Sequence, residues 1–318
     1  KEQAKMGDLL SNVADKGYDA NSIEVLEGLE PVRKRPGMYI GGTDERALHH
    51  LVAEVLDNSM DEAVAGFATR IEVELHEDYA VTIRDNGRGI PIDPHPKFPD
   101  KSALEVIFCT LHAGGKFGGD AYQTSGGLHG VGASVVNALS DSLFVQVAKN
   151  KELYEQRFSR GLPVGSLKKL GPTQNRRGTS VTFHADAEIF GKNQFKPARL
   201  FKSIRSKAYL FSGVEIRWKS AINDGQTPKL ATFHFPGGLS DYLTETLNGV
   251  TTYSKKPFRG TVDFQDRFQT PGKVEWAINW TPSRDGFIQS YCNTVPTPEG
   301  GTHEVGFWAA ILKGIRAY

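Results

Sequence analysis

The chain has 318 residues and a formal net charge of +1, and its 39% hydrophobic and 24% charged residues exclude a disordered or collagen-like protein. Two isolated cysteines argue against a disulfide framework or a zinc site, and the lack of a long apolar run or signal-peptide pattern predicts a cytoplasmic protein outside the membrane. Its 34 glycines exceed the roughly 22 that average usage would give.

Taken in chain order, the polar residues 1–21 predict an N-terminal arm, followed by one domain over 22–235 and a second over 236–318. The boundary is set at the turn-forming residues 236–238 (PGG), after which the hydrophobic pattern restarts. Helices are predicted over 22–35, 48–65, 102–111, 133–139, 197–211 and 239–247, and from 302 onward. Strands are predicted over 71–76, 80–84, 143–147, 154–158, 179–184, 214–218, 261–264, 274–280 and 288–294.

The glycine excess is concentrated, because ten glycines lie between Asp85 and Gly132. Glycine-rich backbone can approach a ligand closely and present several N–H groups to an anion, which favours a phosphate site over a set of plain turns. A P-loop is excluded because residues 115–117 read GKF, and residues 127–132 (GLHGVG) reverse the usual dinucleotide spacing. The helix predicted directly afterwards places these glycines at a helix N-terminus, where free N–H groups attract phosphate.

The helix over 48–65 carries a narrow acidic arc formed by Glu54, Asp57, Asn58 and Asp61. No Lys or Arg lies between residues 47 and 69 to neutralise this arc, which favours a metal or ligand site over a solvated acidic stripe. His50 lies one turn before Glu54 on the same face and could orient it as a base, although a packed histidine is the commoner case.

Asp85 ends a predicted strand and enters the glycine-containing segment 86–91 (NGRGIP). A carboxylate at this position could accept a hydrogen bond from an amino group while a flat ring lies against the glycines. A turn-capping aspartate explains the same pattern equally well.

Three segments together resemble the nucleotide-binding boxes of the ATPase superfamily shared by gyrase, Hsp90, the histidine kinases and the mismatch-repair clamp: 54–59 (EVLDNS), 85–89 (DNGRG) and 125–132 (SGGLHGVG). The segments 32–41 (VRKRPGMYIG), 112–117 (HAGGKF) and 300–303 (GGTH) are similar to the B subunits of bacterial type IIA topoisomerases, from about Tyr18 to the end. Residues 28–31 (GLEP) and 57–59 (DNS) resemble the B subunits of topoisomerase IV more than those of gyrase.

The resemblance implies an α+β fold, with a two-layer α/β sandwich of the gyrase/Hsp90-type (Bergerat) ATPase. A smaller α/β transducer domain, similar to ribosomal S5 domain 2, would follow and would be truncated at its C-terminal end. It implies ATP and Mg²⁺ as cofactors and an ATP-dependent homodimer that closes around double-stranded DNA. The A subunits of topoisomerase IV would bind through regions outside this chain.

The same resemblance assigns site residues one by one. Glu54 would be the general base, oriented by His50, and Asn58 would be the Mg²⁺ ligand, which suits an ion that keeps waters and phosphate oxygens. Asp85 would bind the adenine amino group. Further ATP contacts would come from Arg88, Gly89, Pro91 and Thr179 around the base, from Gly115, Lys116, Tyr122, Leu128, His129, Gly130, Val131 and Gly132 around the phosphates, and from Tyr18 of the partner protomer. Residues 114–127 would form a lid that closes on ATP.

Two departures from the family pattern limit these assignments. The Gln-x-Lys loop, whose lysine contacts the γ-phosphate in the family, has no match before Tyr318, so hydrolysis by this chain alone is expected to be slow. An arginine at the adenine rim of some gyrase B proteins aligns with Lys149, which lacks the planar fork. The domain that takes part in DNA cleavage is also missing, so no strand breakage is expected from this chain alone. The alternatives are a gyrase B protein with the same ATP chemistry, or a clamp that binds nucleotide without hydrolysing it.

Overall fold

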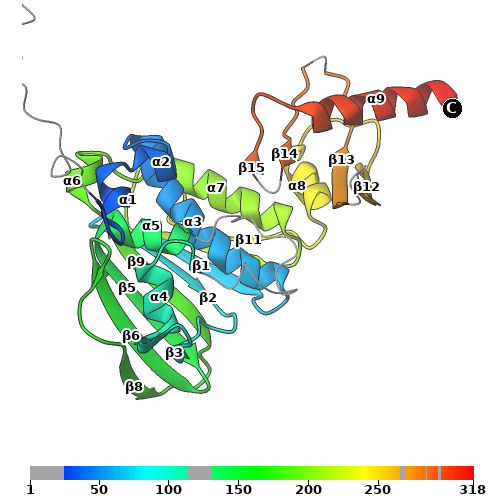
Figure 1. Cartoon of the computed structure of the whole chain (residues 1–318). Helices are drawn as coiled ribbons and strands as arrows, with labels where there is room; N and C mark the ends of the chain where they lie inside the picture. The colour runs from blue at the N-terminus through cyan, green and yellow to red at the C-terminus, as the bar shows by residue number, and fades with distance from the viewer. Residues whose placement is uncertain (1–24, 114–130, 266–269, 284, 293–294) are drawn as a thin grey trace, which may run out of the picture.

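The computed structural model describes residues 25–113, 131–265, 270–283, 285–292 and 295–318, and it divides into two parts (Figure 1). The larger part is built on a nine-stranded sheet, and the smaller part lies beyond the C-terminal end of helix α7 (Pro197–Leu210). Among the described residues, no helix is both long enough and apolar enough to cross a membrane.

The nine-stranded sheet is mixed and has the order β11-β10-β1-β2-β9-β5-β6-β7, with β8 also paired to β6. Only β1 and β10 run parallel; the other paired strands are antiparallel. The strands are β1 (Arg70–Leu75), β2 (Val81–Asp85), β5 (Ser140–Lys149), β6 (Glu152–Ser159), β7 (Leu162–Pro163), β8 (Lys168–Pro172), β9 (Gly178–Ala185), β10 (Glu215–Ser220) and β11 (Leu230–His234).

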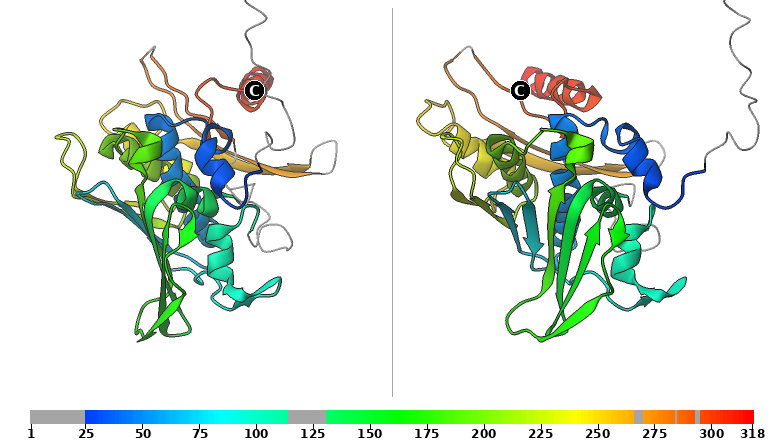
Figure 2. Two further views of the ribbon diagram at one scale, coloured as in Figure 1. Left: turned by 60° about the vertical axis from the view of Figure 1, so that its left-hand side comes forward. Right: turned by 90° about the vertical axis from the view of Figure 1, so that its left-hand side faces the viewer.

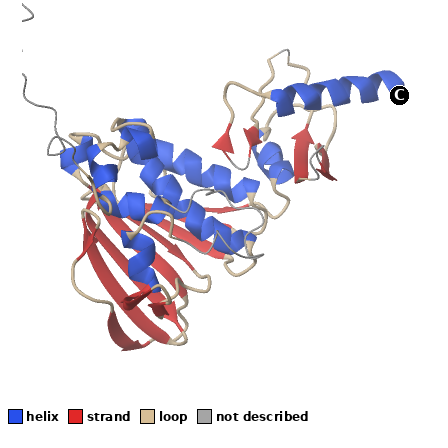
Figure 3. Cartoon of the chain, in the orientation of Figure 1, coloured by secondary structure: helices blue, strands red, loops and turns tan. Residues whose placement is uncertain are grey.

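Helices gather over one face of this sheet and form the second layer (Figure 3), and Figure 2 shows the same layering from two further directions. They are α1 (Glu30–Lys34), α2 (Gly37–Ile40), α3 (Glu45–Val64), α4 (Ala103–Cys109), α5 (Gly132–Ala138), α6 (Ala187–Phe190) and α7. A short hairpin of β3 (Pro94–His95) and β4 (Phe98–Ser102) precedes α4. The expected two-layer α/β sandwich is therefore present.

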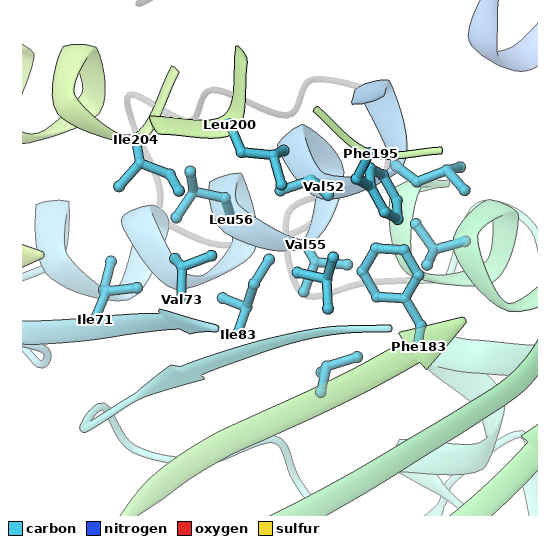
Figure 4. Packing of buried hydrophobic residues seen from close by; sticks show 14 of the residues in the cluster. Val52, Val55, Leu56, Ile71, Val73, Ile83, Phe183, Phe195, Leu200 and Ile204 are labelled. Atoms are coloured by element: carbon cyan, nitrogen blue, oxygen red, sulfur yellow. The ribbon is translucent and has the colours of Figure 1, made fainter. Parts of the chain in front are cut away.

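Helix α3 is the centre of the hydrophobic core. It begins at the N-cap Asp44, whose carboxylate accepts a hydrogen bond from the backbone N–H of Ala47 at 2.8 Å. Val55 faces Ile83 and other sheet residues on one side, and Leu56 faces Leu200 and Ile204 of α7 on the other (Figure 4). Contact on two sides explains why ten of the twenty residues of α3 are buried.

The smaller part contains helix α8 (Leu239–Thr246), the hairpin of β12 (Phe258–Gln265) and β13 (Pro271–Ile278), the short strands β14 (Tyr291–Cys292) and β15 (Val295–Pro296), and helix α9 (Thr302–Ala317). Several large apolar side chains of this part are exposed, among them Trp308 and Leu312 of α9. The hydrophobic core of the described residues accordingly lies in the larger part.

Most predicted elements are present within a few residues of the expected ends, but two were placed wrongly. The helix expected over 22–35 is shorter in the described residues, where α1 begins only at Glu30, because Gly28 adopts a left-handed φ of +59° and Pro31 occupies the first turn. The strand expected over 288–294 is reduced in its described residues to Tyr291–Cys292.

Strands β7, β8 and β11 and the β3–β4 hairpin were missed in the sequence. The alternation of β11 is weak because only Phe233 is buried, and the strand is formed by pairing with β10 at the sheet edge.

Replacement of Leu56 by alanine is expected to reduce the free energy of unfolding by about 2–5 kcal/mol, because the side chain is fully buried between the sheet and α7. Chemical denaturation measures this change. Leu230→Ala removes the same atoms from a side chain that is 70% exposed, so it serves as the matched control and should cost much less. Equal losses for the two variants would contradict the assigned core.

Candidate functional site

The exposed strip of α3 carries the residues expected to act in catalysis. His50 Nε2 lies 3.1 Å from Glu54 Oε1, and both side chains are partly exposed, at 44% and 28%. The hydrogen bond to Glu54 is the largest influence on His50 and raises its pKa, while partial burial opposes the change. Asn58 follows one turn later and is exposed. The predicted pairing of His50 with Glu54 is present, whereas His49 is a packed residue whose Nε2 accepts from the Lys196 N–H at 2.9 Å.

Asp85 lies at the end of β2 with its side chain buried. Its Oδ1 accepts from the N–H of Gly87 at 2.8 Å and from that of Thr179 at 3.3 Å, and its Oδ2 accepts from the Ser59 hydroxyl at 3.3 Å. Burial raises the pKa of Asp85 to about 6, although the two backbone N–H donors favour the ionised form. Asp85 therefore caps the turn at Gly87 and also accepts hydrogen bonds from two other elements, at Thr179 of β9 and Ser59 of α3.

Strand β9 begins directly against this carboxylate. Gly178 has a φ of +101°, and a Cβ atom there would lie 2.1 Å from the backbone oxygen of Asp85, so the close approach requires glycine. The next residue, Thr179, accepts a hydrogen bond from the Ile90 N–H at 3.1 Å. The start of β9 therefore contacts both Asp85 and the segment that follows it. Thr179 lies beside Asp85, as the family resemblance implied.

Arg88 forms an exposed rim beside Asp85. Its Nη2 lies 2.6 Å from Glu62 Oε1, and its guanidinium carbon lies 3.7 Å from the centre of the Phe67 ring. Arg177 supports the same region by donating to the carbonyl oxygens of Asn86 at 2.7 Å and Phe67 at 2.5 Å. Neither Glu62 nor Arg177 was singled out in the sequence, because no local spacing signals contacts between residues so far apart in the chain.

Other predicted base-site residues lie in the same neighbourhood. Gly89 has a φ of +77°, and its carbonyl oxygen accepts from Lys149 Nζ at 3.4 Å. Lys149 thus occupies the rim, as the alignment with the family arginine implied. Pro91 is exposed on the segment that follows.

Helix α5 starts against Glu54. A Cβ atom at Gly132 would lie 2.1 Å from Glu54 Oε2, so only glycine leaves room for the carboxylate at this helix end. The helix is held in place by Asn137, which donates to the Phe108 carbonyl at 2.8 Å, and by Arg33, which donates to the Ala138 carbonyl at 2.7 Å. Val131 is its half-buried N-cap. Gly132, the last glycine of the glycine-rich stretch, therefore lies against Glu54 of α3.

Several predicted contacts lie outside the described residues. They are Tyr18 of the arm and Gly115, Lys116, Tyr122, Leu128, His129 and Gly130 of the glycine-rich segment. The described part of the chain contains no group of three or more His, Cys, Asp or Glu side chains arranged to hold a metal ion. A single amide oxygen such as that of Asn58 still suits Mg²⁺, which takes its other ligands from water and phosphate.

The expectation that the acidic arc lacks a basic partner was wrong at Asp57. Lys207 of α7 places its Nζ 2.6 Å from Asp57 Oδ1. The arc also differs in exposure along its length, since Asp61 is buried and Asn58 is exposed. The expectation considered only the neighbours of α3 in the chain, whereas the partner comes from a helix about 150 residues away.

Comparisons with known proteins agree with this geometry. Residues 43–189 match the family model of histidine kinase-, DNA gyrase B- and HSP90-like ATPases, and residues 238–318 match the model of DNA gyrase B. The B subunit of DNA topoisomerase 4 from Caulobacter vibrioides is 62% identical over 95% of this chain and 44% of its own length. The B subunit of DNA gyrase from Thermotoga maritima is 45% identical over 95% of this chain and 47% of its own length.

A solved structure shows the same arrangement. The 43K ATPase domain of Thermus thermophilus gyrase B, in complex with an aminocoumarin, superposes with a TM-score of 0.74 at 38% identity, covering 89% of this chain and 70% of that one. The chain spans less than half the length of the two curated relatives named above.

The fold and the site define an ATPase domain of the histidine kinase, gyrase B and HSP90 class, followed by a transducer domain. Within that class, the chain belongs to the family of bacterial type IIA topoisomerase B subunits, and its relatives at 52–62% identity are B subunits of topoisomerase 4. Gyrase B proteins are the next group.

Substitution of Asp85 by asparagine is expected to stabilise the fold at pH 8 but not at pH 4. The pKa of this group rises from 3.8 to about 6 on folding, so the folded protein loses stability as the pH rises through this range. The difference corresponds to about 3 kcal/mol, which asparagine would relieve. Urea denaturation at several pH values measures it, with the exposed Asp100→Asn as control. If Asp85→Asn were less stable than the unmodified protein at pH 8, the raised pKa assigned to Asp85 would be contradicted.

Gly132→Ala is expected to leave the protein folded while displacing the Glu54 carboxylate, because the new methyl group would occupy the position of Glu54 Oε2. The predicted result is at least a tenfold loss of ATP hydrolysis, on the order expected when a reacting group is misplaced. Steady-state ATPase rates and a thermal midpoint measure the two effects. Gly314→Ala on α9 meets no atom within 4 Å and is the matched control. A normal rate in Gly132→Ala would show that Glu54 does not act from this position.

Proposed function

We propose that this chain binds ATP with Mg²⁺ and forms the ATP-hydrolysing part of a topoisomerase IV B subunit. The observation that carries the proposal is that helix α3 contacts two chemically different ends of the proposed site. Glu54 meets the start of α5 at one end, and Ser59 contacts the buried Asp85 at the other. Five residues of helix separate them by about 7.5 Å, so a single ligand could meet both.

The base end of this site suits adenine. The ionised Asp85 would accept a hydrogen bond from the adenine amino group, and burial would exclude competing water. Thr179, beside it, would hold a water between the protein and the ring. Arg88 and Pro91 would cover the exposed edge. These contacts would orient the nucleotide without taking part in the chemistry.

The other end suits phosphate hydrolysis. Glu54 would take a proton from the attacking water, and His50 would hold the Glu54 carboxylate in position through their 3.1 Å contact. When bound to the phosphates through Asn58, Mg²⁺ would neutralise the negative charge that develops there. Gly132 is the residue that allows the start of α5 to approach closely enough.

We further propose that ATP binding closes a homodimer and drives the passage of double-stranded DNA, together with the A subunits of topoisomerase IV. The identity with topoisomerase 4 B subunits supports this over gyrase, because the gyrase relative matches less closely. We also propose a cytoplasmic location and a domain boundary near residue 236, where β11 has ended and the Gly238 N–H bonds back to the Phe235 carbonyl. With the full-length subunits, decatenation without negative supercoiling would support topoisomerase IV; ATP-driven negative supercoiling would indicate gyrase.

Glu54→Gln is expected to bind ATP with near-normal affinity but to hydrolyse it at least a hundredfold more slowly, because the amide cannot accept the proton of water. The measurement is single-turnover cleavage of the γ-phosphate, alongside titration with a non-hydrolysable ATP analogue, in a protein extended past Tyr318 to the length of its relatives. Asp85→Asn is the complementary variant and should lose affinity for the analogue.

The same experiment separates the alternatives. Slow but real γ-phosphate cleavage by the unmodified protein excludes a clamp that only binds nucleotide. Hydrolysis by Glu54→Gln at the unmodified rate would overturn the assigned role of Glu54.

A further inference from the structure

A buried ion pair joins α7 to the strip of α3 that carries the proposed hydrolytic residues. Lys207 Nζ lies 2.6 Å from Asp57 Oδ1, and the two side chains are only 8% and 18% exposed. Asp57 directly precedes Asn58 and lies three residues after Glu54 on α3. The two groups meet as an ion pair without the alignment of a regular hydrogen bond. The contact therefore acts on the turn of α3 that connects Glu54 with Asn58.

The burial of this pair sets it apart from the other ion pairs of α7. Arg199 with Glu45 and Arg205 with Glu245 involve side chains that are 30–56% exposed, where water screens the attraction. Lys207 and Asp57 are partly withdrawn from water, so loss of one partner leaves an uncompensated charge between two helices. Movement of α3 relative to α7 at this point is correspondingly restricted.

Helix α7 is itself held firmly, so it can serve as a fixed base for Lys207. Leu200, Ile204 and Ala208 anchor one face of the helix in the core. On another face, the Tyr209 ring stacks on Tyr242 of α8 with ring centres 3.8 Å apart.

The Tyr209 contacts extend into the smaller part of the chain. Its hydroxyl hydrogen-bonds the hydroxyl of Tyr291 on β14, and both Tyr209 and Tyr291 lie within hydrogen-bond distance of Gln289 Oε1. Lys207, which contacts Asp57 of α3, thus lies two positions before Tyr209, which contacts the transducer domain.

We propose that Lys207 is a positioning residue for ATP hydrolysis: through its ion pair with Asp57 it fixes the turn of α3 that presents Glu54 and Asn58. This inference rests on the proposed function of those two residues. Lys207 acts on them through Asp57 and does not itself touch the nucleotide. Its loss should therefore lower kcat while leaving the adenine end of the site, at Asp85, able to bind.

The test compares Lys207→Met, Asp57→Asn and the double variant in the protein extended past Tyr318 to the length of its relatives. Each is measured for thermal midpoint, for affinity toward a non-hydrolysable ATP analogue, and for kcat. Lys202→Met, on the exposed side of the same helix, is the matched control and should behave as the unmodified protein. Lys207→Met should lower the thermal midpoint, because it leaves Asp57 uncompensated.

The double variant distinguishes positioning from stability alone. Removal of both charges should restore part of the lost thermal midpoint, because no uncompensated Asp57 charge then remains between the two helices. We expect its kcat to remain at least about tenfold low, with analogue affinity changed by less than about threefold. Recovery of kcat together with the thermal midpoint would overturn the proposal and leave the pair a structural contact. Unchanged kcat in Lys207→Met would overturn it as well.

Glu54→Gln measured in parallel separates this inference from the proposed function. If Glu54→Gln is inactive while the double variant hydrolyses ATP normally, only the role of Lys207 is wrong. If Glu54→Gln hydrolyses ATP at the normal rate, the proposed function of the site fails, and the inference about Lys207 fails with it.

Discussion

Burial of helix α3 on two sides is the constraint on which the rest of the site depends. The sheet covers one side of the helix and α7 covers another, so ten of its twenty residues are buried. Most of its accessible polar side chains lie on the side that remains. Each of them must therefore meet a ligand, water or an opposite charge, because unpartnered polar groups beside a core are costly. His50, Glu54 and Asn58 remain accessible on this strip, whereas Asp57 is neutralised by Lys207.

Asp85 shows what such a site costs in stability. Its carboxylate is 6% exposed and has a raised pKa, so keeping it ionised at neutral pH opposes folding. Three donors, from Ser59, Gly87 and Thr179, offset part of that cost and also hold the carboxylate in one orientation. The same three donors leave the carboxylate facing the segment that follows β2, where the proposed adenine contact would form.

The contact between the two parts of the chain gives α7 a second role. Its Leu200, Ile204 and Ala208 complete the core of the larger part, and Tyr209 packs on Tyr242 of the smaller part. The hydrolytic strip and the transducer domain are thus both attached to one helix. Lys207 and Tyr209, two residues apart on α7, thus make the contacts to α3 and to the smaller part respectively.

The elements with strong periodicity and the residue types of the site could be predicted from the amino-acid sequence. The patterns of α3 and α7, the i to i+4 spacing of His50 and Glu54, and the glycines before α5 are local features, and local geometry decides them. Family resemblance added the roles proposed for Asp85 and Asn58. The contacts between distant side chains came from the folded structure alone: Lys207 with Asp57, Glu62 with Arg88, and Arg177 with the carbonyl of Phe67. These contacts depend on how helices and strands pack across the sheet, and no spacing along one chain records that packing.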